Sequence, residues 1–489
     1  MVFSSVAFLF WFLPATLLLF HAAPARVRLP VLLAASLAFY FYGENWLIWV
    51  MLASTGIDYV CALMIAGSSP SGSVAVLPAH GPRTPWQRGW LAVSIASNLA
   101  LLGYFKYFDF FVENAIRLLD ALRLGHLGLD GLARVALPLG ISFYTFQSMS
   151  YTIDVYRGRV AANRSLLEFS TFVTMFPQLV AGPIVRYSDI EGQLRSPGRS
   201  VGEFAEGVRR FIGGLAKKVL IANPMALVAD RAFALPEQDL TWGIAWAGLA
   251  AYTLQIYFDF SGYSCMAIGL GRMFGFRFPE NFDFPYVATS VREFWHRWHM
   301  TLSTWFRDYV YFPLGGSRGS EAATWRNLLI VFVACGLWHG ASWNFVAWGL
   351  FHGLFISMER TALGRVVSRV PRPLRHAYLM LVVMVGWVLF RCDTLSHGLS
   401  YAAALLPHAS TSLRTARELL PNESIAVLAI GAAFCAPVVP WLRARVERLG
   451  GHPRLAAELA WTAALFGLLV LSAGFLASGS YNPFIYFRF

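Results

Sequence analysis

Residues 326–358 read "RNLLIVFVACGLWHGASWNFVAWGLFHGLFISM", two apolar runs that meet at Gly340. Each run approaches the roughly 20 residues that a helix needs to cross a bilayer, so we predict spans at about 326–340 and 342–358. His339 ends the first run with no charged residue beside it. Ionisable residues inside membrane spans are functional by default, which makes His339 the first candidate. A core histidine that bonds to a carbonyl or hydroxyl is the alternative.

The composition also indicates a membrane protein. Of 489 residues, 57% are hydrophobic and 13% are charged, about half the charged share of a soluble domain. Lys and Arg outnumber Asp and Glu by 39 to 27, a net charge of +12. We assign this excess to cytoplasmic loops and expect no nucleic-acid partner. The five cysteines show neither a disulfide framework nor a zinc pattern. We predict one integral membrane domain over residues 1–489.

Further apolar runs predict an all-helical, multi-pass chain. Besides the two runs above, the expected spans are residues 3–20, 30–43, 45–67, 88–108, 136–153, 168–185, 241–270, 376–391, 424–441 and 458–478. The 3–20 run has no basic residues before it, so we read it as an uncleaved first helix. Interruptions by Gly and Pro predict re-entrant segments. Residues 204–222 and 289–312 mix apolar and basic side chains, and we expect them at the membrane interface.

Loop charges predict the orientation. Residues 360–375 contain five arginines and no acid, and residues 443–454 contain four arginines against Glu447. The loop between them, 391–423, balances its charges. Because cytoplasmic loops carry the Lys and Arg excess, the first two loops should be cytoplasmic and the third periplasmic. This places the final residues, 481–489, outside.

Residues 292–316, "REFWHRWHMTLSTWFRDYVYFPLGG", are the densest polar and aromatic group. His296 and His299 are three apart and should share one helix face, while Arg307 and Asp308 add charge. An amphipathic helix at the headgroup level explains this composition. A polar wall facing His339 is the functional alternative. A metal site needs more ligands than the chain clusters, so we expect none.

Two apolar stretches contain polar residues at membrane depth. Residues 255–271, "QIYFDFSGYSCMAIGLG", hold Asp259, Ser261 and Tyr263, and residues 176–187, "FPQLVAGPIVRY", hold Gln178 between two prolines. Both stretches are predicted to be broken helices that line a cavity. Helix–helix packing through small residues is the alternative.

Six ordered motifs carry a resemblance that covers residues 3–489. They are "PLGISFYTFQSMSYTIDVYRG" (138–158), "FPQLVAGPIVRYSDI" (176–190), "FDFSGYS" (258–264), "FWHRWHMTLSTWFRDYVYFPLGG" (294–316), "LWHGASWNFVAWGLFHG" (337–353) and "NPFIYFRF" (482–489). The chain resembles the alginate O-acetylation (AlgI) branch of the membrane-bound O-acyltransferases, to which the D-alanylation protein DltB is related. Where that family usually has an acidic residue, this chain has Cys265, which leaves a carboxylate role there in doubt.

The resemblance implies an all-α polytopic fold. It is a ring of roughly 11 transmembrane helices, with re-entrant and interfacial helices, around a thinned centre crossed by a tunnel. His339 matches the family's essential histidine, and His299 matches its second one. His339 would act as a general base on an acceptor hydroxyl or be transiently acetylated. The supporting or tunnel residues would be His296, Asp308, Arg307, Asp259, Trp338, Asn344, Ser261, Tyr263 and Gln178.

The implied function is an O-acetyltransferase of the bacterial inner membrane. No cofactor would be bound, and acetyl-CoA would be the donor substrate. Acetyl would pass across the membrane to periplasmic SGNH-type proteins that modify an alginate- or cellulose-type exopolysaccharide. Three alternatives stay open: a transporter of acetyl groups or polymer, a scaffold for periplasmic machinery, and D-alanyl transfer to teichoic acid.

Overall fold

The computed structural model describes residues 2–67, 76–79, 81–124, 129–132, 134–198, 200–408, 414–479 and 481–484. Within these ranges every regular element is helical, which agrees with the predicted class. The chain divides into two compact units. The first comprises Met1–Val2, Ala7–Gly207 and Leu270–Pro279, and the second comprises Phe3–Val6, Val208–Gly269 and Glu280–Phe489. A single domain over residues 1–489 stays a prediction.

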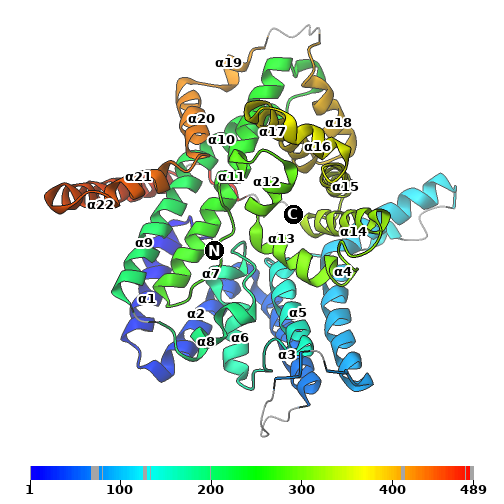
Figure 1. Ribbon diagram of the computed structural model, residues 1–489, viewed down its shortest axis with the longest axis vertical. Helices are drawn as coiled ribbons and strands as arrows, with labels where there is room; N and C mark the ends of the chain where they lie inside the picture. Colours follow the sequence, from blue (N-terminus) through cyan, green and yellow to red (C-terminus); the bar gives the residue numbers. More distant parts are fainter. Residues whose placement is uncertain are drawn as a thin grey trace. The chain divides into compact units, whose positions relative to one another are not determined.

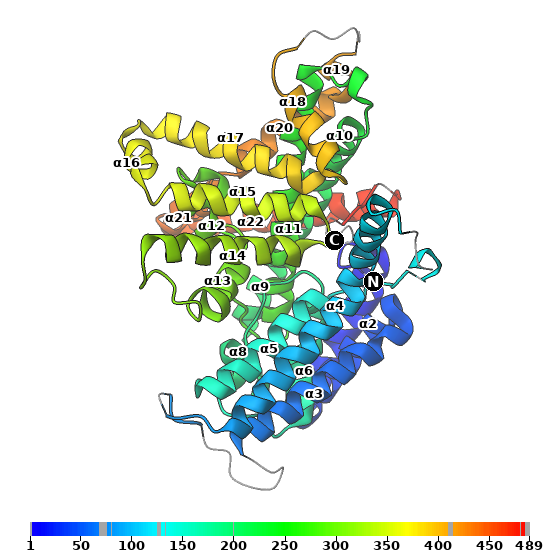
Figure 2. The same ribbon diagram turned by 90° about the vertical axis from the view of Figure 1, so that its right-hand side faces the viewer.

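The first unit packs three long helices against one another. Its α-helices are α1 (Leu13–Ala22), α2 (Ala25–Glu44), α3 (Ile48–Ala66), α4 (Pro85–Ala121), α5 (Ile141–Arg157), α6 (Leu166–Thr174), α7 (Phe176–Leu179) and α8 (Tyr187–Arg195). Helices α3, α4 and α5 lie side by side (Figure 2). Asp58 of α3 accepts hydrogen bonds from Ser94 Oγ at 2.6 Å and Asn98 Nδ2 at 2.8 Å, both of α4. Such polar contacts hold helices together where lipid supplies no hydrophobic driving force between them.

The second unit contains the histidine motifs. Helix α9 (Val201–Ala216) leads into it. Its further elements are the π-helical turn η4 (Lys217–Ala222), α10 (Asn223–Phe233), α11 (Trp242–Met273), α12 (Val291–Arg297), α13 (Met300–Phe306), the π-helical turn η7 (Arg307–Tyr311), α14 (Glu321–His339), α15 (Trp343–Met358), α16 (Ala362–Arg369), α17 (Arg372–Arg391), α18 (Leu395–Ala404), α19 (Ala416–Leu419), α20 (Asn422–Phe434), α21 (Val438–Glu447) and α22 (Gly451–Ala477) (Figure 1). Helices α14, α15 and α17 pack in that order (Figure 2).

Several helices have the length and composition to cross a membrane. In the described part of the chain these runs are Ala25–Ala66, Pro85–Ala121, Val201–Phe233, Arg372–Arg391 and Gly451–Ala477. The pair α20 and α21, bent by 60°, would make a sixth. The first run contains both α2 and α3, which are separated by the positive φ of Asn45 (+48°). These runs support a multi-pass protein, whereas the ring of about 11 helices and the tunnel stay predictions.

Three predicted segments differ from the helices observed. Residues 168–185 do not form one helix, because α7 ends at Leu179 and α8 begins at Tyr187. Residues 424–441 are interrupted between α20 and α21. Residues 204–222, predicted to be interfacial, belong to a 33-residue run that is apolar enough to span. One of its basic side chains, Lys218, forms a buried ion pair with Asp259.

The segment 481–484 returns to the second unit. Asn482 Nδ2 donates to the Ser4 carbonyl at 2.7 Å, and Lys218 Nζ donates to the Pro483 carbonyl. The Tyr263 ring lies between Phe3 and Phe484, with centroids 4.4 and 4.6 Å away. Sequence positions near both ends of the chain are therefore tied to η4 and α11. Residues 485–489 of the terminal motif lie outside the described residues.

Candidate functional site

His339 occupies the last position of α14, where two glycines bring α14 and α15 into backbone contact. A Cβ on Gly336 would lie 2.1 Å from the Phe345 carbonyl oxygen, and one on Gly349 would lie 2.3 Å from the Phe332 carbonyl oxygen. Any larger residue would force the helices apart. The close approach holds the end of α14, and His339 with it, against α15.

The His339 ring is enclosed by aromatic side chains. It is 5% exposed. Ring centroids of Trp338, Trp348 and Phe390 lie 4.9, 5.2 and 5.1 Å from it, all at steep angles. These residues come from α14, α15 and α17, the three helices that pack in sequence. Trp338 was predicted as a supporting residue, whereas Trp348 and Phe390 were not, because their proximity depends on the packing of distant helices.

His299 lies in a break between α12 and α13. It adopts the left-handed conformation with φ of +43°, which is uncommon for a residue with a side chain. Its side chain is fully buried, with the Phe260 ring 4.6 Å away. Nδ1 forms a 3.0 Å hydrogen bond with Asn281 Oδ1. Burial lowers the pKa of His299, which lies outside the candidate membrane spans, to about 3, so the ring is neutral at neutral pH.

The two histidines meet at one indole. The Trp338 ring lies 5.9 Å from the His299 ring and 4.9 Å from the His339 ring. A residue from the α12–α13 break and the final residue of α14 thus flank the same side chain. The arrangement puts two buried imidazoles close to a single aromatic side chain.

The shared helix face predicted for His296 and His299 is wrong. The helix stops at Arg297, and the positive φ at His299 redirects the chain. His296 is exposed, and its Nδ1 bonds to the Arg292 carbonyl at 2.7 Å, while His299 is buried. Spacing alone could not reveal this break, since it depends on contacts with the distant Asn281.

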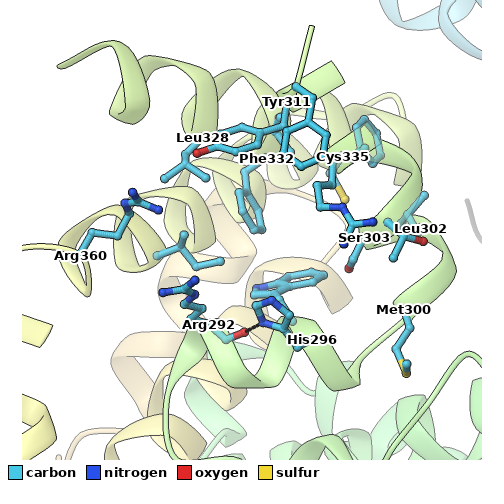
Figure 3. Close-up of a pocket in the computed structure, with 17 residues that line it drawn as sticks. Arg292, His296, Met300, Leu302, Ser303, Tyr311, Leu328, Phe332, Cys335 and Arg360 are labelled. Carbon is cyan, nitrogen blue, oxygen red and sulfur yellow. Dashed lines mark hydrogen bonds between the residues drawn. The ribbon is translucent and has the colours of Figure 1, made fainter. Parts of the chain in front are cut away.

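His296 instead lines a pocket of about 440 Å³ formed by α12, α13, η7, α14 and α15. Arg292 and Arg360 lie on one side of the pocket, and Cys335 and Ser303 lie on the opposite side (Figure 3). Between them the walls are largely aromatic and aliphatic. Among the described residues, no ion pair engages the guanidinium of Arg292 or Arg360. The pocket therefore combines an apolar interior with two arginines that form no ion pair to any described residue, while the Glu359 carboxylate accepts from the Arg292 backbone N at 3.0 Å.

The other charged residues predicted at the site lie in ion pairs. Arg307, which also lines the pocket, bonds through Nε to Asp308 Oδ1 at 2.7 Å. Asp259 lies 2.9 Å from Lys218 Nζ, with both side chains 2% exposed. Lys218 was not among the predicted residues. The sequence feature that could have identified Lys218 is its position within an apolar run, because a buried lysine requires an acidic partner.

The remaining predicted residues have structural surroundings. Asn344 Nδ2 donates to the Cys392 carbonyl and so ties the start of α15 to the end of α17. Ser261 is buried in α11 beside Tyr263. Helix α11 runs unbroken from Trp242 to Met273, so the predicted break in residues 255–271 is wrong. Gly262, which suggested a break, lies within this continuous helix. It allows close contact with Gly214, since a Cβ on Gly262 would lie 2.8 Å from the Gly214 carbonyl oxygen.

Gln178 belongs to the first unit, where residues 180–186 connect α7 to α8 without a helix, as predicted. Its side chain is buried and donates to the Phe172 carbonyl. His352, on α15, is also fully buried, and neither of its ring nitrogens has a hydrogen-bond partner among the described residues. No group of three His, Cys, Asp or Glu side chains in the described ranges could hold a metal ion.

Comparisons with known proteins agree with these motifs. The membrane-bound O-acyltransferase family model matches residues 159–400. The chain is 40% identical to a probable alginate O-acetylase of Azotobacter vinelandii, over 100% of both chains. It is 31% identical to a peptidoglycan O-acetyltransferase of Helicobacter pylori, over 100% of this chain and 98% of the relative. A teichoic acid D-alanyltransferase of Bacillus subtilis is 27% identical over 41% of this chain and 53% of the relative.

Proposed function

The chain belongs to the membrane-bound O-acyltransferase family, and we propose that it transfers acetyl from cytoplasmic acetyl-CoA toward the O-acetylation of an alginate-type exopolysaccharide. It is an O-acyltransferase and a multi-pass membrane protein. The observation that carries the proposal is the pair of buried histidines, His299 and His339, that flank Trp338. The full-length likeness to alginate O-acetylases supports acetyl over D-alanyl as the transferred group.

In the proposed reaction His339 acts as the general base. The acceptor oxygen attacks the thioester carbonyl while His339 takes the hydroxyl proton. The carbon–sulfur bond breaks, and the proton passes to the departing thiolate, which leaves an acetyl ester and a free thiol. The aromatic enclosure of His339 keeps the site apolar and limits water, which would otherwise hydrolyse the thioester.

The basic pocket supports a phosphate-bearing donor. Arg292 and Arg360 suit phosphate oxygens, which guanidinium groups bind in a bidentate manner. The opposite side of the pocket holds Cys335, which is four residues before His339 on the same helix. At 1.5 Å per residue the two Cα atoms are about 6 Å apart along the axis. In this proposal the phosphates of acetyl-CoA bind the arginines, and its thin thioester arm follows the apolar wall toward His339.

The proposal also specifies the proteins that receive the acetyl group and the membrane in which the chain lies. Acetyl leaves on the periplasmic side of the inner membrane to SGNH-type proteins, which esterify the polymer. Support comes from the names of two full-length relatives, a probable alginate O-acetylase and a peptidoglycan O-acetyltransferase. The arginine-rich loops support the proposed orientation, because cytoplasmic loops carry more Lys and Arg.

The test measures polymer acetylation in cells and acetyl transfer in vitro. His339→Ala should abolish O-acetylation while the protein still accumulates in the membrane, and His299→Ala should weaken it. The control is His452→Ala, because His452 is exposed on α22. Purified protein should transfer labelled acetyl from acetyl-CoA, and Arg292→Gln/Arg360→Gln should raise KM for that donor. Normal acetyl content in His339→Ala, or the lack of any bond-forming transfer by the purified wild type, would contradict the proposal and favour a scaffold or a transporter.

A further inference from the structure

Asn281 organises the break that carries His299. It is 1% exposed and lies between α11 and α12. Its side-chain Oδ1 contacts Thr301 N at 3.3 Å, Thr301 Oγ1 at 2.9 Å and His299 Nδ1 at 3.0 Å. Its Nδ2 donates to Ser264 Oγ at 3.0 Å, and its carbonyl accepts from Met300 N at 2.9 Å. One asparagine therefore binds His299 itself, the two residues that follow it, and Ser264 of α11.

These contacts determine which His299 nitrogen carries the proton. A backbone N–H is always a donor, so the atom of Asn281 that faces Thr301 N is the oxygen and not the amide nitrogen. An amide oxygen only accepts. His299 Nδ1, which bonds to the same oxygen, must therefore be the protonated nitrogen. In the neutral ring the lone pair is then on Nε2.

We propose that Asn281 is a positioning residue, which fixes His299 as the Nδ1–H tautomer and so keeps the Nε2 lone pair available to accept a hydrogen bond from the acceptor hydroxyl during acyl transfer. The inference rests on the proposed function. His299 Nε2 is buried and has no partner among the described residues. An unsatisfied buried acceptor is costly, which argues that a substrate group completes it.

The surroundings of His299 make its protonation state depend on Asn281. Phe260 of α11 and Trp338 of α14 face the ring, and neither carries charge. The nearest titratable group shown on that side is His339, beyond Trp338. Burial alone accounts for the low pKa of His299. A carboxylate in place of the Asn281 amide would be the first charge to contact the ring, and it would favour the imidazolium.

The experiment compares Asn281→Asp, Asn281→Leu and a control, Asn422→Asp, in purified full-length protein. Asn281→Asp keeps an acceptor oxygen and nearly the same shape, and it should move the acid limb of the kcat profile up by about 1–3 pH units. Its activity should recover at high pH, because a raised pKa leaves His299 neutral only above that pKa. Asn281→Leu should lower kcat about 10- to 100-fold with little change in KM for acetyl-CoA. Asn422→Asp makes the same amide-to-carboxylate change at an exposed position of α20 and should stay within about twofold of wild type.

A second readout does not depend on activity. Nitrogen-15 histidine NMR, with His299 assigned by comparison with His299→Gln, should show protonated Nδ1 and unprotonated Nε2 in wild type. An Nε2–H tautomer, or an Asn281→Asp profile equal to wild type in a folded protein, would overturn the inference. If the wild type transfers no acetyl at all, the proposed function fails, and the tautomer measurement still decides the role of Asn281.

Discussion

The buried ion pair between Lys218 and Asp259 allows a quantitative test of the fold. Nζ and Oδ1 are 2.9 Å apart, and both side chains are 2% exposed. With an effective dielectric constant of about 20, Coulomb's law gives about 6 kcal/mol of attraction, most of which desolvation of the two ions offsets. The intact pair therefore adds little net stability. Removing one partner leaves a buried charge and should cost about 3–5 kcal/mol.

We expect both single variants, Lys218→Met and Asp259→Leu, to lower the thermal unfolding midpoint in detergent by several degrees. Lys218→Met should cost more, because it also deprives the Pro483 carbonyl of its donor. The double variant should be distinctly more stable than the sum of the single changes predicts, since it leaves neither charge buried. The assay follows monomer loss by size-exclusion chromatography after heating.

An exposed pair on the same chain serves as the control. Arg454 Nε and Glu458 Oε1 are 3.1 Å apart on α22, with both side chains about half exposed. Exposed pairs spaced i,i+4 contribute about 0.3–0.5 kcal/mol, so Glu458→Gln should leave the midpoint almost unchanged. Strict additivity of the Lys218 and Asp259 variants, or single variants as mild as Glu458→Gln, would refute the reasoning.

Two further predictions concern packing and charge. Gly336→Ala should lower the thermal midpoint and reduce acetyl transfer, because its Cβ would overlap the Phe345 carbonyl and cost about 1–3 kcal/mol; Gly467→Ala, with open space around its Cβ, should do neither, and equal effects would contradict the packing argument. Cys265→Asp should keep activity and leave the midpoint equal or higher, because Lys217 Nζ is already 3.6 Å from the Cys265 sulfur and would pair with a carboxylate. A lower midpoint for Cys265→Asp would show that Lys217 does not serve as its partner.

The sequence predicted the helical class and much of the segment order, because long apolar runs need helices in a bilayer. The runs that became α11, α14, α15 and α17 were found within a few residues. His339 could be singled out from the chemistry of one apolar run, since an imidazole there has no local explanation. The motif resemblance then added His299, which the structure brings beside the same indole.

The remaining features depend on contacts that no local pattern encodes. The left-handed conformation of His299 follows from bonds around Asn281, a residue that spacing and composition gave no reason to select. The lysine-containing run 204–222 looked interfacial because Asp259, its neutralising partner, is far along the chain. The break predicted in residues 255–271 was also wrong, because Gly262 permits close helix contact without interrupting α11.

The bonds made by residues 481–484 set an order for assembly during synthesis. Lys218 and Asp259 leave the ribosome more than 200 residues before Pro483, whose carbonyl accepts a hydrogen bond from Lys218 Nζ. Ser4 is made 478 residues before Asn482, whose side-chain amide donates to the Ser4 carbonyl. Until Pro483 is synthesised, Lys218 has Asp259 as a partner but lacks this carbonyl acceptor.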